Sequence, residues 1–208
     1  DVYKRQLQGQ EVNPILQDKI LTVHPPLIYL AYAGFFLCYT LVFVGVVQKN
    51  IEPLQALLRQ FVRMSWSFLT LGIALGSFWA YYELGWGGYW SWDPVENSSL
   101  LLWLIATALL HALVQPKAQI LTILLAVFSF WAVLFALFVT RASFLLSVHN
   151  FSQQPAVDIW FFCCLALLFI CGIILLFLRL PYLFLKQEGG GAFLSLIHIS
   201  EPTRLRRI

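Results

Sequence analysis

The chain has 208 residues, of which 60% are hydrophobic and only 11% are charged. A soluble domain is nearer half apolar and one quarter charged, so this composition excludes an ordinary soluble protein. The formal net charge of +3 is small, so it does not indicate a strongly charged binding partner. The sequence therefore indicates an integral membrane protein.

The two ends of the chain differ from the rest. Residues 1–6 (DVYKRQ) and 195–208 (SLIHISEPTRLRRI) resemble translated sequencing-adapter read-through, as found at the edges of metagenomic fragments. They hold five basic and two acidic residues, and the difference of +3 equals the whole formal net charge of the chain. We therefore expect the authentic domain at residues 7–194, expect no nucleic-acid partner, and exclude His198 from any site.

Apolar stretches follow one another along the chain, each near the ~20 residues that cross a bilayer. They begin at Leu27, Met64, Ser98, Gln119 and Ile159 and run to about Val47, Tyr82, Val114, Val139 and Leu185. Polar connectors, among them Gln48–Arg63 and Thr140–Asp158, separate them. The sequence therefore predicts an all-α, polytopic membrane protein with about five transmembrane helices.

Basic residues are distributed unequally between the two predicted sides. One side receives Lys49, Arg59, Arg63, Lys117, Arg179 and Lys186, and the other receives only Lys19 and Arg141. By the positive-inside rule the first side is cytoplasmic. The other side then receives His24, His149 and the stretch at residues 83–97.

Residues 83–97 read Glu-Leu-Gly-Trp-Gly-Gly-Tyr-Trp-Ser-Trp-Asp-Pro-Val-Glu-Asn. The stretch is too polar to cross a bilayer and too aromatic for an ordinary solvated loop, which predicts an interfacial tryptophan-rich loop. Its glycines permit turns that other residues resist. An aromatic belt that only anchors the protein is the alternative.

A helix is expected to begin directly after this loop. Asp93 is a good N-cap, Pro94 fits the first helical position, and Glu96 stands where a capping box requires it. Asp93 and Glu96 are therefore interpreted as helix-capping residues rather than as acid–base catalysts.

The segment Trp-Gly-Gly-Tyr-Trp-Ser-Trp-Asp-Pro-Val-Glu-Asn resembles the "WWD" signature of the haem-handling proteins of cytochrome c maturation. Within that superfamily it is most similar to the CcmF/NrfE haem lyase subunits. The CcsA-type relatives typically follow Trp-Asp-Pro with Lys-Glu-Thr, where this chain has Val95-Glu96-Asn97. Tyr89 and Ser91 depart from the commonest CcmF form, so the choice between CcmF and NrfE stays open.

Two histidines outside the apolar stretches flank the loop. A lone interfacial histidine is usually a polar residue at a helix end, but haem iron takes axial histidines and a porphyrin needs a flat apolar surface. Because His24 precedes Pro25 and Pro26, we expect it on extended backbone. Val23–Tyr29 resembles the His-Pro-Pro-Leu segment of CcmF, and Ser147–Phe151 resembles its Ser-Val-His segment.

The resemblance implies that His24 and His149 are the axial ligands of a b-type haem in the loop. The haem platform would consist of Trp86, Gly87, Gly88, Tyr89, Trp90, Trp92 and Asp93. The chain itself is not expected to supply a catalytic nucleophile.

Two further residues are candidates. His111 lies within the third apolar stretch, where an ionisable residue is costly and a functional candidate by default; the alternative is a helix-end histidine reaching interfacial water. The resemblance implies that His111 ligates a second b-type haem, only in the full-length protein, with a partner further along it. Arg141 is either a contact for a haem propionate or an interfacial anchor.

The four cysteines lie in apolar runs and form no Cys-x-x-Cys pair. They are predicted to be buried small hydrophobes and carry no information about redox compartment.

The resemblance implies the haem-binding core of a cytochrome c haem lyase, active in a complex, which holds haem for attachment to Cys-x-x-Cys-His of apocytochrome c. Expected partners are apocytochrome c, the haem chaperone, the thiol-reducing proteins of the maturation system, and the lipid bilayer. The expected location is the bacterial inner membrane, favoured over an organellar one, with the haem site facing the periplasm. The alternatives are a haem transporter without bond-forming activity and an electron-transfer subunit, which should carry paired histidines inside its spans.

Overall fold

A computed structural model describes residues 17–85, 87–115, 118–142, 145, 147, 149, 159–174 and 177. All regular secondary structure in those residues is helical. The two ends expected to be non-native, residues 1–6 and 195–208, lie outside the described residues.

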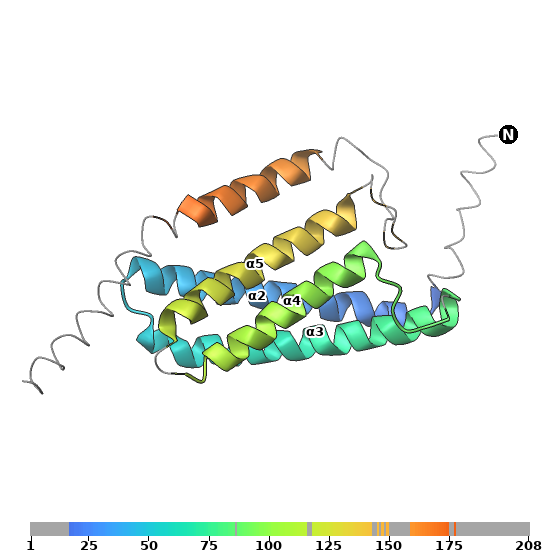
Figure 1. Ribbon diagram of the computed structural model, residues 1–208, viewed down its shortest axis with the longest axis horizontal. Helices are drawn as coiled ribbons and strands as arrows, with labels where there is room; N and C mark the ends of the chain where they lie inside the picture. The colour runs from blue at the N-terminus through green and yellow to red at the C-terminus, as the bar shows by residue number, and fades with distance from the viewer. Residues whose placement is uncertain are drawn as a thin grey trace, which may run out of the picture.

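Four long helices form the body of the protein (Figure 1). They are α2 (His24–Val47), α3 (Gln55–Glu83), α4 (Pro94–Ala112) and α5 (Gln119–Arg141), and they contain 24, 29, 19 and 23 residues. Two single turns, η2 (Ile20–Thr22) and η3 (Glu52–Leu54), precede α2 and α3. All four long helices are long and apolar enough to cross a membrane, so the prediction of an all-α, multi-pass membrane protein is confirmed.

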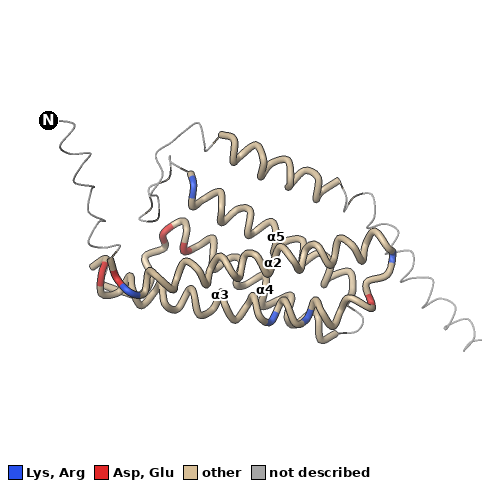
Figure 2. Tube along the Cα trace, turned by 180° about the vertical axis from the view of Figure 1, so that it is seen from behind, with Lys and Arg blue, Asp and Glu red and all other residues tan. Residues whose placement is uncertain are grey.

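The helices pack as an antiparallel bundle in which α2 and α4 each contact both α3 and α5. Apolar side chains fill its centre in two clusters, one around Val42 and Leu58 and the other around Phe35 and Leu102. Lys, Arg, Asp and Glu of the described residues lie mostly toward the two ends of the bundle, and the basic residues of α3 lie further inward (Figure 2). That distribution suits a hydrocarbon surrounding.

Two predicted boundaries are wrong. The expected connector Gln48–Arg63 is helical from Gln55 onward, because Leu58 and Val62 are fully buried and their spacing places them on one helix face. His24 is not on extended backbone but is the first residue of α2. The turn η2 leads straight into the helix, and the prolines occupy its first turn, where a missing N–H costs nothing.

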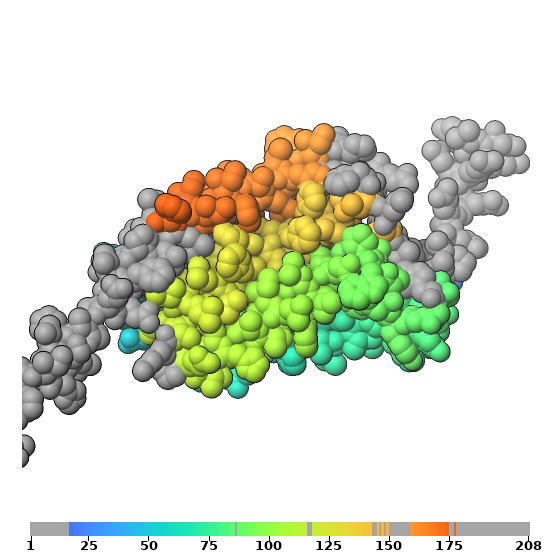
Figure 3. All heavy atoms as spheres, viewed as in Figure 1, coloured from blue at the N-terminus to red at the C-terminus, as the bar shows by residue number. Residues whose placement is uncertain are grey.

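A fifth helix is described at Ile159–Ile174, and it lies along one flank of α5 (Figure 3). The ring centroids of Trp131 and Phe169 are 4.6 Å apart, and those of Phe138 and Phe162 are 4.4 Å apart. The rest of the span predicted to Leu185 lies almost wholly outside the described residues.

The prediction for the cysteines is confirmed only in part. Cys38 is buried in the bundle, whereas Cys163, Cys164 and Cys171 are exposed. They lie on the fifth helix, which contacts the bundle along one flank and leaves its outer face uncovered by other described helices.

Candidate functional site

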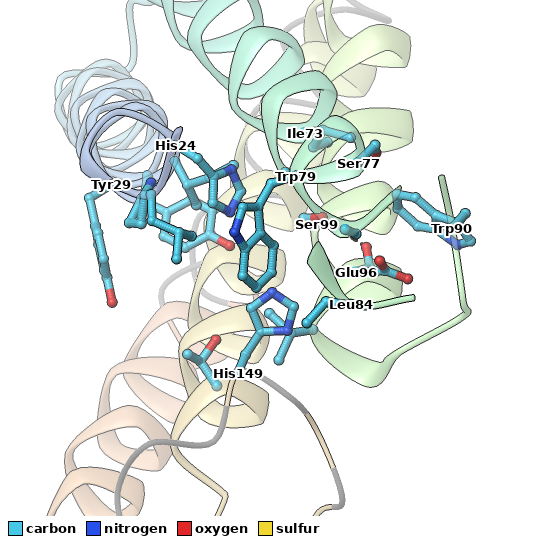
Figure 4. Close-up of a pocket in the computed structure, with 18 residues that line it drawn as sticks. His24, Tyr29, Ile73, Ser77, Trp79, Leu84, Trp90, Glu96, Ser99 and His149 are labelled. Carbon is cyan, nitrogen blue, oxygen red and sulfur yellow. Dashed lines mark hydrogen bonds between the residues drawn. The ribbon is translucent and has the colours of Figure 1, made fainter. Parts of the chain in front are cut away.

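A cavity of about 390 Å³ opens at the end of the bundle where α2 and α4 begin and α3 and α5 end. This volume falls in the range of small-molecule pockets. Figure 4 labels lining side chains from α2, α3 and α4 and from the segments that follow α3 and α5. They are His24, Tyr29, Ile73, Ser77, Trp79, Leu84, Trp90, Glu96, Ser99 and His149.

His24 is fixed by the backbone of α3. Its Nδ1 lies 2.7 Å from the carbonyl oxygen of Gly72. Because a carbonyl only accepts, Nδ1 carries the proton in the neutral ring, and Nε2 keeps a free lone pair. The hydrogen bond thus selects the tautomer whose other nitrogen can bind a metal.

Two glycines of α3 make this close approach possible. Gly72 and Gly76 are four residues apart and face α2, which is the small-residue spacing of close helix pairs in membranes. A Cβ on Gly76 would lie 2.6 Å from Cε1 of His24. The imidazole therefore packs directly on the backbone of α3.

His149 is held by Asp93 at the start of α4. Its Nδ1 lies 3.1 Å from Oδ2 of Asp93, which also accepts hydrogen bonds from the Ser147 hydroxyl at 2.9 Å and the Val95 amide at 3.0 Å. With Nδ1 facing a carboxylate, Nε2 of His149 is again the free nitrogen. Carboxylates orient metal-ligating histidines in this manner.

The pKa of Asp93 lies below its ordinary value. Burial acts to raise this pKa and is outweighed by the hydrogen bonds from His149, Ser147 and Val95, together with the electrostatic interaction with the His149 ring. The carboxylate is therefore ionised at neutral pH and available to the imidazole.

The predicted capping box at the start of α4 is confirmed. Asp93 caps the first turn through its side chain, and Oε2 of Glu96 accepts from the amides of Asp93 and Ser91 at 3.2 and 3.1 Å. Trp92, just before the cap, has a φ of 62°, an unusual backbone for a bulky residue. The amide side chain of Asn97 donates to the Trp92 carbonyl at 3.0 Å and stabilises that conformation.

Two imidazoles whose Nδ1 atoms are hydrogen-bonded line one cavity, and the Nε2 atom of each could serve as a ligand to a metal held inside a cofactor.

The structure brings together only some of the predicted platform residues. Trp90 lines the cavity, whereas Trp92 is 71% exposed and its ring is nearly perpendicular to that of Trp90. Tyr89 is exposed and stacks on Tyr81 of α3 with ring centroids 4.4 Å apart. Gly87 does not line the cavity and has a positive φ of 74°, in the region that glycine adopts readily.

The remaining predicted positions lie off the cavity. Gly88 does not line it, and a Cβ there would meet no atom within 4 Å. Trp86 is outside the described residues. Arg141 ends α5 at the same end of the bundle and is exposed, but only its neighbour Thr140 lines the cavity. His111 lies in the last turn of α4, at the opposite end, and is exposed.

Trp79 is not among the site residues that the sequence predicts. Its side chain lines the cavity, and in the view of Figure 4 its ring is drawn between the imidazoles of His24 and His149. Gly72, Gly76 and Trp79 recur at helical spacing on one face of α3, and that periodicity was the available signal.

The family model described as "Cytochrome C assembly protein" matches residues 2–149. The chain belongs to this family of cytochrome c assembly proteins. It is 45% identical over 192 residues to the cytochrome c-type biogenesis protein CycK of Rhizobium meliloti, covering 89% of this chain and 28% of the relative.

Relatives named CcmF and NrfE match the chain at similar sequence identity. The chain is 42% identical over 176 residues to CcmF of Escherichia coli, covering 82% of this chain and 27% of the relative. It is 41% identical over 162 residues to NrfE of Haemophilus influenzae, covering 73% of this chain and 25% of the relative. The resemblance to the CcmF/NrfE family is thus confirmed, and the chain spans less than a third of the length of these relatives. No solved structure matches the chain significantly.

Proposed function

We propose that this chain forms the haem-binding core of a cytochrome c haem lyase, with haem held between His24 and His149. The family places the chain in cytochrome c maturation. The observation that carries the proposal is that two histidines, 125 residues apart in sequence, line one cavity, each with a hydrogen-bonded Nδ1, which leaves Nε2 as the nitrogen that can bind a metal. When bound, the haem supplies two vinyl groups that add the thiols of Cys-x-x-Cys-His in apocytochrome c.

In this reaction the chain would bind the haem and position it for the incoming thiols. The Gly72 carbonyl and the Asp93 carboxylate orient the two imidazoles, and Trp90, Ile28 and Ile73 supply apolar cavity walls that exclude water. No side chain needs to act as a nucleophile, because both thiols come from the client protein. Catalysis would come mainly from holding the reacting groups in place.

Covalent attachment distinguishes this function from the alternative, a haem carrier that makes no bonds. The full-length protein with its maturation partners and an apocytochrome c should yield haem that stays with the client after denaturation and gives a pyridine haemochrome spectrum. An apocytochrome with both thiols replaced by alanine is the matched control and should yield none. If the intact client receives only extractable haem, the protein is a carrier.

We also propose that the cavity faces the periplasm, across the inner membrane from the turn between α2 and α3. A single cysteine in place of exposed Ser91, with the four native cysteines replaced, should react with a membrane-impermeant maleimide from the periplasmic side. Asn50→Cys, exposed at the opposite end of the bundle, is the control and should react only after the membrane is opened. The reverse pattern would overturn the orientation.

His111 is proposed to ligate a second b-type haem in the full-length protein. It is exposed in the last turn of α4, at the end of the bundle away from the cavity, where a further helix of the longer protein can approach it. This site is separate from the one formed by His24 and His149.

A further inference from the structure

The indole N–H of Trp79 is a buried hydrogen-bond donor without an acceptor in the described part of the bundle. Its side chain is buried, with 5% of the residue exposed, and its Nε1 has no hydrogen-bond acceptor among the described residues. An indole N–H can only donate, and a buried one usually finds a partner. Because Trp79 lines the cavity, an acceptor atom on a ligand there would satisfy it.

Among the described residues that line the cavity there is no lysine or arginine. The carboxylate of Glu96 already accepts two backbone amides. In this part of the lining, the groups that can receive an anionic group of a ligand are therefore neutral donors. The Nε1 of Trp90 is a second buried donor on the lining that has no acceptor in the described part of the chain.

The position of Trp79 indicates which part of a planar ligand it meets. In the view of Figure 4 its ring is drawn between the imidazoles of His24 and His149, and all three side chains line one cavity. If the two imidazoles held a haem, a side chain on the cavity wall beside them would meet the edge of the macrocycle, where the haem carboxylates are attached.

We propose that the indole N–H of Trp79 donates a hydrogen bond to a haem carboxylate and so sets the rotation of the macrocycle between the two histidines. This inference rests on the proposed haem site. It makes Trp79 a positioning residue whose N–H, rather than its ring alone, recognises the ligand.

The test compares the affinity of the purified full-length protein for haem and for haem dimethyl ester, in which both carboxylates are esterified. The wild type should prefer the free acid by about tenfold or more, since a hydrogen bond to a charged group is among the stronger ones. Trp79→Phe should lose most of that preference and keep the six-coordinate visible spectrum. Without haem it should lose only the stability that the smaller buried ring costs, because the removed N–H had no partner.

Trp131→Phe is the matched control. Its Nε1 is likewise buried without an acceptor among the described residues, but it faces the helix Ile159–Ile174 and not the cavity. This variant should keep the wild-type preference. If Trp79→Phe does not fold, replacing the Trp79 indole by its benzothiophene isostere removes the N–H and keeps the shape.

An unchanged preference in the Trp79 variant, or equal binding of haem and its ester by the wild type, would overturn the inference and leave the haem site standing. If the wild type binds neither porphyrin, the proposed function itself fails.

Discussion

Replacing His24 or His149 by alanine in the full-length protein is expected to open one coordination position of the haem. Each imidazole comes from a different part of the fold, so the remaining histidine cannot fill both positions. The yield of covalent cytochrome c should fall by more than the roughly 10–100-fold that loss of a second-shell partner costs. The visible spectrum of each purified variant and the cytochrome yield measure the two effects.

Added imidazole should restore part of the six-coordinate spectrum and of the yield in either single variant, because it can occupy the vacated position. His111→Ala is the control and should leave the spectrum of the cavity haem unchanged. A wild-type spectrum and yield in the His24→Ala/His149→Ala double variant would refute the ligand assignment.

The second large effect is expected from Asp93→Asn. Asparagine is as good an N-cap as aspartate, so α4 should stay folded, but the charged hydrogen bond to Nδ1 of His149 is lost. Haem affinity should fall roughly 10–100-fold, the usual effect of removing a partner that orients a metal ligand. Asp93→Ala should in addition lower the free energy of unfolding by about 1 kcal/mol through loss of the cap.

Asp18→Asn is the matched control, since Oδ1 of Asp18 accepts a hydrogen bond from the Ile20 amide of η2 at the same end of the bundle. Wild-type haem affinity in Asp93→Asn would show that Asp93 is only a helix cap.

The lowered pKa of Asp93 also predicts how haem retention depends on pH. The contribution of the Asp93 carboxylate to the stability of the site is fully present above the ordinary carboxylate pKa of about 3.9, and it is lost as the pH falls through the lower pKa of the folded protein. Asp93→Asn should lack that acid transition in haem retention.

Local sequence signals predicted the parts of this fold that depend on neighbouring residues. Long apolar runs marked the spans, and three residues, Asp93, Pro94 and Glu96, marked the start of α4. The beginning of α3 was missed because Arg59 and Arg63 made the segment appear to be a connector. Those charges lie on the exposed face of a helix whose other face buries Leu58 and Val62.

The candidate site depended on contacts between distant parts of the chain, which spacing alone does not encode. The resemblance nominated His24 and His149, but not the Gly72 carbonyl that orients one or the Asp93 carboxylate that orients the other. Asp93 was predicted as a cap, and its hydrogen bond to a residue 56 positions away appears only in the folded protein. Trp79 shares a helix face with Gly72 and became a cavity residue only once α2 was placed against that face.

The central claim is that one haem lies between these two histidines, and low-temperature electron paramagnetic resonance of the ferric protein tests it most directly. The full-length His111→Ala variant should be used, so that only the cavity haem contributes. The account predicts a low-spin signal of bis-histidine type that is lost when His24 or His149 is also replaced by alanine. A high-spin signal, or a low-spin signal that survives replacement of both histidines, would contradict it.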